Sequence, residues 1–156
     1  MRFLFVDKII KIEKGKHARM VKNVSISEDY FSHHFPDYPV MPGALMLETV
    51  EQAAGILISY SLDYKALAML ELVNKAKFRR IVRPGDQVEV DIKIKDLNQK
   101  NADVSAQILL EDESVATMKL SFLLKYEQDL QIAPQINQMK CLYEILTRNV
   151  YQNSFF

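Results

Sequence analysis

The sequence of 156 residues lacks most features of a secreted, membrane-spanning or disulfide-bonded protein. Its single cysteine, Cys141, excludes a disulfide within the chain. No run approaches the roughly 18 uncharged apolar residues that a membrane-spanning helix needs. The start, MRFLFVDKII, is not a convincing signal peptide, because Asp7 interrupts the apolar run and no small-residue cleavage site follows. We therefore expect a cytoplasmic protein.

Neither basic nor acidic residues are in excess. The 20 basic and 20 acidic side chains balance to a formal net charge of zero, which gives no argument for nucleic-acid binding. There are no repeats or low-complexity segments, and the length suits one domain with its own core. Cys141 has no histidine beside it, so an ordinary semi-buried thiol is a simpler interpretation than a catalytic one.

The body of the chain is expected to hold one buried helix and five or six mostly antiparallel strands. Residues 43–59 are apolar on most sides, which is typical of a buried helix, and Pro42 suits its first turn. Alternation of apolar and charged residues is clearest over residues 88–95. Further strands are expected over residues 8–12, 18–26, 66–79, 104–110 and 116–126, with polar turns between several of them. Such a pattern indicates an α+β domain.

Residues 127–156 differ from the body because glutamine and asparagine become frequent. Apolar residues recur at helical spacing: Ile136, Met139, Leu142, Tyr143, Leu146 and Val150. This predicts an amphipathic helix appended to a domain of residues 1–126. Packing on its own domain or on a symmetry-related copy is the simpler expectation, and binding of another protein is the alternative.

The stretch HHFPDYPVMPGALMLE, residues 33–48, holds the best candidates for chemistry. Its prolines restrict the backbone, so the loop could hold the imidazole of His34 at one angle, as a general base requires. Glu48 lies on the apolar helix, where a carboxylate has no evident structural use, and Gln52 shares its face one turn later. The N–H of Gly43, at the start of the helix, could receive a carbonyl oxygen that gains negative charge. Base, acid and oxyanion donor suit removal of an α-proton with loss of a β-leaving group.

Simpler interpretations exist for each candidate. A lone histidine in a loop is usually structural or solvated. A metal site formed by His33, His34 and Glu48 is a weak alternative, because adjacent histidines point apart in an extended segment. Glu51 is most simply a polar helix residue that faces a gap or water. No nucleophile elbow supports a Ser-His-Asp arrangement.

These residues resemble the signature of the FabZ-type 3-hydroxyacyl-[acyl-carrier-protein] dehydratases. The matches are residues 34–36, Pro39, residues 41–43, Leu45, Glu48 and residues 52–53, with residues 5–7, 21–25, 76–80 and 83–86 around them. The resemblance covers roughly residues 3–126. It implies a hot-dog fold, in which an antiparallel sheet wraps a long central helix. It also implies a homodimer or a trimer of dimers, with the histidine from one subunit and the glutamate from the other.

The same resemblance implies the roles of individual residues. His34 would take the α-proton of a (3R)-hydroxyacyl thioester, and Glu48 would help protonate the departing β-hydroxyl to leave a trans-2-enoyl thioester. The Gly43 N–H would bind the thioester carbonyl, supported by Pro42 and Gln52. No metal or organic cofactor is implied. The substrate would arrive on an acidic acyl carrier protein in fatty-acid or related acyl-chain biosynthesis, and the candidate docking charges are Lys77, Arg79, Arg80 and Arg83.

Two departures from the family pattern concern substrate and partner more than reaction type. His33 and Asp37 stand where the family usually has glycine. They suggest a specialised pathway member, although the role of His33 is unexplained. Two other functions stay open: an acyl thioesterase of the hot-dog fold, with water activated by Glu48, and a non-catalytic acyl-binding or assembly subunit that holds a partner through the tail helix.

Overall fold

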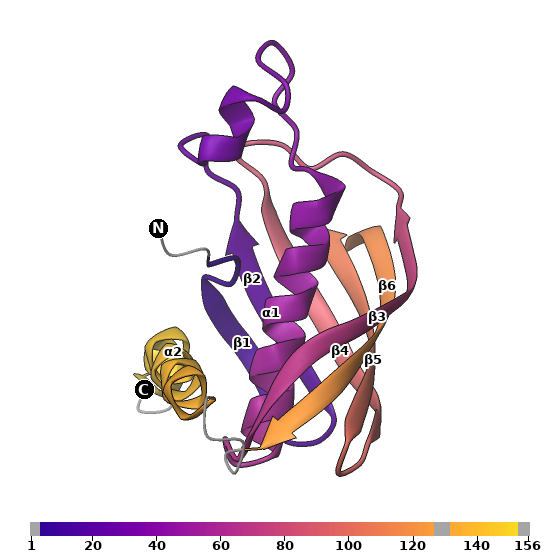
Figure 1. Cartoon of the computed structure of the whole chain (residues 1–156). Helices are drawn as coiled ribbons and strands as arrows, with labels where there is room; N and C mark the ends of the chain where they lie inside the picture. The colour runs from indigo at the N-terminus through magenta and orange to yellow at the C-terminus, as the bar shows by residue number, and fades with distance from the viewer. Residues whose placement is uncertain (1–3, 127–131, 153–156) are drawn as a thin grey trace.

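Six strands and two long helices make up the computed structural model, which describes residues 4–126 and 132–152, with side chains to residue 147. The elements are β1 (Lys8–Glu13), β2 (His17–Asn23), the 3-10 helix η1 (Asp29–Ser32), α1 (Gly43–Ser61), β3 (Ala66–Phe78), β4 (Gln87–Leu97), β5 (Asn101–Leu110), β6 (Glu113–Tyr126) and α2 (Ala133–Gln152) (Figure 1). The predicted α+β architecture is confirmed. The second strand ends at Asn23, three residues before its expected end at residue 26.

The strands form one sheet in the order β1-β2-β4-β5-β6-β3, and every neighbouring pair is antiparallel. Strands β4, β5 and β6 follow one another as hairpins, whereas β3 pairs with β6 and β2 with β4 across longer separations. Strands β1 and β3 are therefore the two edges of the sheet. Two register shifts interrupt the pairing of β3, which explains why its apolar residues do not alternate cleanly.

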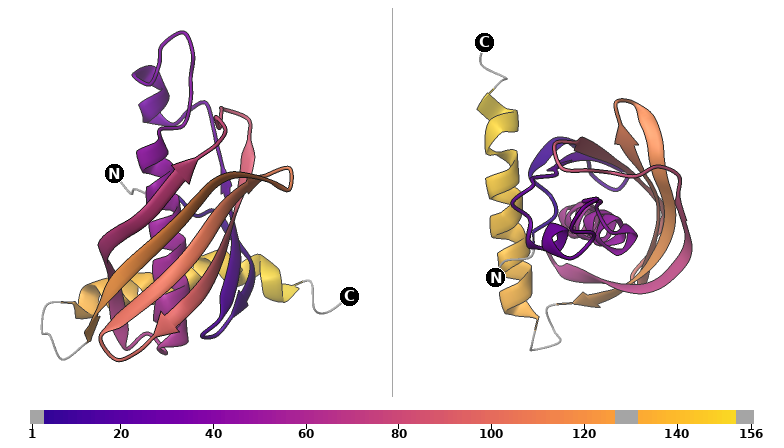
Figure 2. Two further views of the ribbon diagram at one scale, coloured as in Figure 1. Left: turned by 90° about the vertical axis from the view of Figure 1, so that its right-hand side faces the viewer. Right: turned by 90° about the horizontal axis from the view of Figure 1, so that it is seen from above.

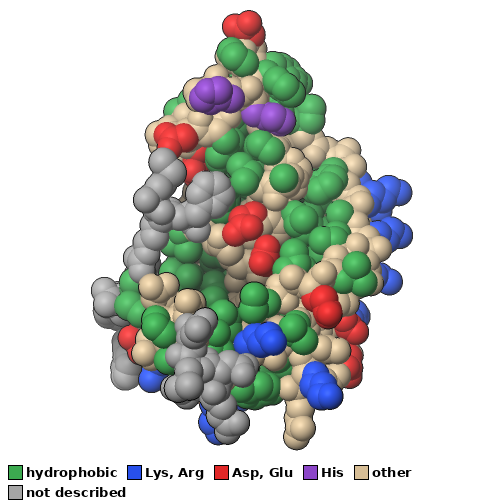
Figure 3. Space-filling model, in the orientation of Figure 1, with side chains coloured by type: hydrophobic (Ala, Val, Ile, Leu, Met, Phe, Trp, Pro, Cys, Tyr) green, Lys and Arg blue, Asp and Glu red, His purple; other side chains and the backbone are tan. Residues whose placement is uncertain are grey.

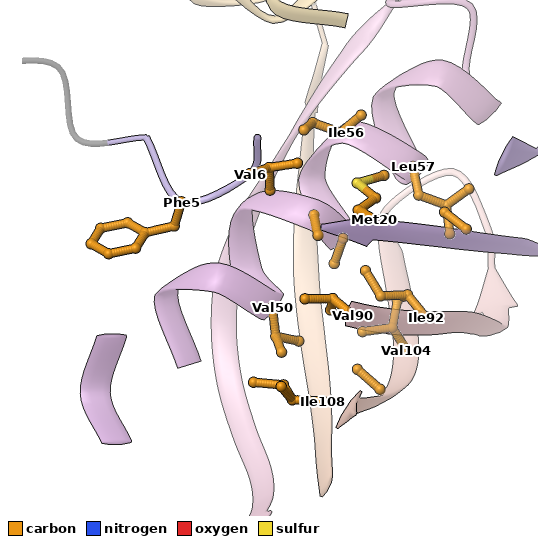
Figure 4. Close-up of a cluster of buried hydrophobic side chains, with 14 of the residues drawn as sticks. Phe5, Val6, Met20, Val50, Ile56, Leu57, Val90, Ile92, Val104 and Ile108 are labelled. Carbon is orange, nitrogen blue, oxygen red and sulfur yellow. The ribbon is translucent and has the colours of Figure 1, made fainter. Parts of the chain in front are cut away.

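The core lies between α1 and the concave face of the curled sheet. In β4 the alternating residues Val88, Val90 and Ile92 are buried, as predicted. They meet buried α1 side chains such as Val50 and Leu57 (Figure 4). Removal of this apolar surface from water, worth roughly 25 cal/mol per Å², fixes α1 inside the sheet. The helix extends to Ser61, two residues beyond the predicted end.

Helix α2 runs across the C-terminal part of α1, on a side that the sheet leaves open (Figure 2). It contacts α1 and both edge strands, β1 and β3. Five of its described apolar residues face this contact: Ile136, Tyr143 and Leu146 are buried, and Met139 and Leu142 are half-buried. The predicted tail helix thus packs on its own chain, while Val150 lies outside the described side chains. Cys141 is exposed rather than semi-buried, and the division of the chain after residue 126 stays a prediction.

Lys22 explains the imperfect alternation of β2. Its side chain shares the inward face with Ala18 and Met20 and is only 4% exposed. The ammonium group donates to Glu28 at 2.7 Å, lies 3.5 Å from Asp7, and sits over the ring of Phe5. Buried cations need such partners, and here they tie the N-terminal segment to the chain that leads into η1. No helix in residues 4–126 or 132–152 is long and apolar enough to cross a membrane.

Candidate active site

His34 lies in a loop that its own backbone hydrogen bonds close. The Val40 N–H donates to the His34 carbonyl at 3.1 Å, and the Tyr38 N–H donates to the Phe35 carbonyl at 3.0 Å. The Met41 N–H then donates to the Val82 carbonyl at 2.8 Å, which attaches the loop to the segment between β3 and β4. The peptide bond between His34 and Phe35 is cis. The three hydrogen bonds, together with the prolines, hold the loop in one conformation.

The imidazole of His34 has a defined tautomer. Its Nδ1 atom lies 3.1 Å from the Val40 carbonyl oxygen. A carbonyl can only accept, so Nδ1 is the donor, and in the neutral ring the lone pair therefore lies on Nε2. The half-buried ring also stacks on Phe35, with the two centroids 4.3 Å apart. The backbone therefore presents Nε2 as a proton acceptor.

His33 is not a second member of the site. Its side chain is exposed, and its Nδ1 atom lies 2.6 Å from the hydroxyl oxygen of Ser32. Within the described part of the chain, no group of three or more His, Cys, Asp and Glu residues is arranged to hold a metal ion. A metal site built from His33, His34 and Glu48 is thus not assembled in the single chain.

The N-terminus of α1 offers backbone donors, among them the N–H of Gly43. The carbonyl of Pro42 accepts from the N–H groups of Leu45 and Met46 at 2.9 and 3.1 Å. Between residues 4 and 126, and in the described part of α2, nothing accepts the N–H of Gly43. A Cβ atom at this position would lie 3.3 Å from the ring of Phe78. Glycine thus lets the Phe78 ring pack closely beside an N–H at the positive end of the helix dipole.

Glu48 is held by a chain of hydrogen bonds that begins at the N-terminal segment. The Phe5 N–H donates to Oε1 of Gln52 at 2.8 Å, and Nε2 of Gln52 donates to Oε1 of Glu48 at 2.6 Å. The first bond fixes which end of the amide is the donor, so Gln52 orients the carboxyl group. The sequence indicates that Glu48 and Gln52 are neighbours on the helix. It does not indicate the donor at Phe5, because any residue other than proline supplies a backbone N–H.

The face of α1 around Glu48 is open in the single chain. Glu48 is half-buried rather than fully buried, since the sheet and α2 cover other sides of the helix. In Figure 3, acidic side chains on this side of the molecule are surrounded by hydrophobic ones. Burial, followed by the negative charge of Glu48, raises the pKa of Glu51 above its ordinary value of 4.5. Glu51 is therefore half-buried beside Glu48 and does not simply face water.

The four predicted docking cations separate into two groups. Arg79, Arg80 and Arg83 line one surface hollow of about 740 Å³, formed by the chain segment that connects β3 to β4 and by the end of β5, whereas Lys77 is not part of its lining. Arg80 forms an ion pair with Glu113. Arg83 lies over the ring of Tyr38, 4.7 Å from its centroid, and donates to its hydroxyl. This hollow therefore adjoins both the His34 loop and Phe78, which packs on Gly43.

The family model and the similar proteins point to the same family. A model of the FabA-like domain matches residues 1–119. The chain is 38% identical over 126 residues to the 3-hydroxyacyl-[acyl-carrier-protein] dehydratase FabZ of Thermoanaerobacter sp. (strain X514), covering 80% of this chain and 89% of that protein. It is 46% identical over 96 residues to the FabZ of Coxiella burnetii (strain RSA 331 / Henzerling II), covering 59% of this chain and 68% of that one.

Solved structures support the fold. The dehydratase heterocomplex ApeI:P from Xenorhabdus doucetiae contains a chain that superposes with a TM-score of 0.69 at 15% identity. The match covers 81% of this chain and 86% of that chain. At this identity the likeness concerns the fold alone, which agrees with the sheet wrapped around α1.

Proposed function

The chain belongs to the FabA-like family, together with the FabZ dehydratases, and on this premise we propose that it removes water from (3R)-3-hydroxyacyl thioesters carried by an acyl carrier protein. The product is the trans-2-enoyl thioester, so the protein is a hydro-lyase of fatty-acid or related acyl-chain biosynthesis, acting in the cytoplasm. The observation that carries the proposal is the tautomer of His34. Its Nδ1–H donates to the Val40 carbonyl, which leaves Nε2 to act as the base.

The residues fit the separate parts of the reaction. Nε2 of His34 takes the α-proton, and the electron pair forms the double bond as the β-hydroxyl leaves. Glu48 gives that hydroxyl a proton, so that water departs and the carboxylate remains beside Gln52. The N–H of Gly43 donates to the thioester oxygen, on which negative charge develops. A proton passing from His34 to Glu48 then restores both groups.

A second copy of the chain would complete this site. Strand β3 is an edge of the sheet, and such an edge has unpaired backbone groups. Its large apolar side chains are exposed: Met69, Leu72, Val73 and Phe78. We infer a homodimer that pairs along β3 and covers the open face of α1, with His34 from one subunit meeting Glu48 from the other. Three such dimers could assemble into a hexamer.

The hollow between β3 and β4 suits an acidic carrier. Three arginines and two acidic residues, Asp86 and Glu111, line it, so that basic groups are in excess close to the Gly43 end of α1, where the thioester must arrive. Guanidinium groups bind carboxylates and phosphates through paired hydrogen bonds. We propose that the carrier docks here and that its phosphopantetheine arm passes toward the His34 loop.

The test is incubation of the purified protein with 3-hydroxyacyl carriers, followed by mass spectrometry for the loss of water. We expect His34→Ala and Glu48→Gln each to lower kcat/KM by about 10²–10⁴-fold, the usual contribution of a general acid or base. His33→Ala, at the exposed neighbouring position, is the matched control and should retain the rate. Thermal unfolding of each variant checks that the fold is intact.

Other products would overturn the proposal. Release of free acid and carrier thiol would identify a thioesterase. No turnover of any hydroxyacyl carrier, with a partner protein co-purifying in stoichiometric amount, would instead identify a non-catalytic subunit. Full activity in His34→Ala would remove this histidine from the mechanism.

A further inference from the structure

Helix α2 is fixed against the C-terminal half of α1 by aromatic contacts. The ring of Tyr143 stacks on Tyr60 with the centroids 4.9 Å apart, and meets the edge of Tyr64 at 5.8 Å. Further along, a Cβ atom at Gly55 would lie 3.9 Å from the terminal methyl group of Met139. Aromatic pairs of this kind hold their elements in a defined orientation. The helix is thus positioned well enough to shape a binding site.

A cavity of about 280 Å³ lies between α2 and α1. Its apolar walls are Ile56 of α1, Leu67 of β3, Leu4 of the N-terminal segment, and Met139 and Leu142 of α2, and Gln135 and Gln138 of α2 lie at its polar side. Gln52 also lines it, and the same amide donates to Glu48. The cavity therefore begins at the residue that orients the proposed catalytic acid. It continues along α1 for about one turn, roughly 6 Å, to Ile56.

We propose that this cavity receives the distal end of the acyl chain, and that Met139 and Leu142 of α2 set the length of chain accepted. The inference rests on the proposed function, which places the reacting carbons beside Glu48. A chain that continues past Gln52 lies against the apolar side chains of this cavity, where burial of each methylene contributes about a fourfold gain in affinity. The FabA-like domain match ends at residue 119, so the part of the wall that closes the cavity comes from beyond it.

The cavity can be tested without turnover by measuring the binding of saturated acyl-pantetheine thioesters of increasing chain length. We expect the wild-type affinity to rise by about fourfold per methylene until the chain fills the cavity. Leu142→Trp should end this rise at a shorter chain and lower the affinity for longer chains by about tenfold or more, the contribution of roughly two methylenes. Ile145→Trp, on the exposed side of α2, is the matched control and should follow the wild-type profile.

Met139→Ala provides a second variant with the opposite expectation. It enlarges the cavity, so the rise in affinity should extend to longer chains. An unchanged length profile in both variants, or an equal loss at every length including the shortest, would overturn the role of α2.

Turnover of hydroxyacyl carriers of the same lengths is measured separately. Absence of dehydration would refute the proposed function, while the binding profile would still decide whether the cavity holds an apolar chain. If the enzyme is active, Leu142→Trp should lower the ratio of kcat/KM for long over short substrates.

Discussion

At the scale of single residues, the site depends on backbone groups as much as on side chains. The carbonyl of Val40 selects the tautomer of His34, and the amide of Phe5 selects the orientation of Gln52. The buried Lys22 helps to hold Phe5 in place through Asp7, Glu28 and the aromatic ring. The catalytic candidates are thereby oriented before any substrate binds, which is the arrangement that acid–base chemistry requires.

Glu51 gives a prediction about pH. Its pKa is raised, chiefly by burial and then by Glu48, so the fold favours the protonated form. The free energy of unfolding should therefore fall as the pH rises above the ordinary value of 4.5 and through the raised value. Glu51→Gln removes this cost. We expect its Tm to exceed that of the wild type by about 1–2 °C at neutral pH, and to equal it near pH 4.

Thermal unfolding monitored by circular dichroism at the two pH values checks this expectation. Glu144→Gln, at an exposed position of α2, is the control and should change the Tm at neither pH. If Glu51→Gln raised the Tm equally at both pH values, ionisation of Glu51 would not be the cause.

At the scale of elements, the segment between β3 and β4 carries three of the proposed docking charges, Arg79, Arg80 and Arg83. Arg79 is exposed and, among the described residues, has no ion pair, whereas Arg80 already faces Glu113. Arg79→Glu should raise the KM for a carrier-bound substrate about tenfold and leave the KM for a pantetheine thioester unchanged, because only the carrier supplies acidic surface. Lys77→Glu, outside the hollow, should have a smaller effect.

Steady-state kinetics with the two substrate forms, at low and high salt, measure this difference. The wild-type KM for the carrier substrate should rise with ionic strength, since exposed charges are screened. An equal rise of KM for both substrate forms in Arg79→Glu would place the arginine at the reaction site instead of a docking surface.

The elements also show how much of the structure could be predicted from the sequence. Strand β4 could be predicted from its alternation and α2 from its helical spacing, because burial on one face imposes those periods. Strand β3 could be located but not its role as an edge, since two register shifts break its period and four of its large apolar side chains are exposed. His34, Gly43, Glu48 and Gln52 were identifiable as neighbours along the chain. The amide of Phe5 and the cavity beneath α2 arise from long-range packing, which leaves no local pattern.

At the scale of the whole molecule, the inferred dimer makes a sharp prediction about mixed variants. His34→Ala and Glu48→Gln are each expected to be inactive alone. If the two residues of one site come from different subunits, a mixed dimer keeps one complete site. Unfolding equal amounts of both variants and refolding them together should then restore about a quarter of the wild-type activity, since half of the dimers are mixed and each has one of two sites.

Size-exclusion chromatography with light scattering should accompany this measurement, to establish that the refolded material is dimeric or a multiple of the dimer. No recovery in a well-formed mixed dimer would mean that each subunit supplies both residues of its own site. A monomer with full activity would contradict the inferred assembly altogether.

The hydrogen bond from His34 to Val40 bears on the direction of the reaction. Nδ1–H is the donor both before and after Nε2 takes a proton, so the ring need not rotate between the two states. A base that keeps one orientation through the cycle serves the addition of water to an enoyl thioester as well as its removal. The enzyme would then bring hydroxyacyl and enoyl thioesters toward equilibrium, and net flow would depend on the reaction that next consumes the enoyl product.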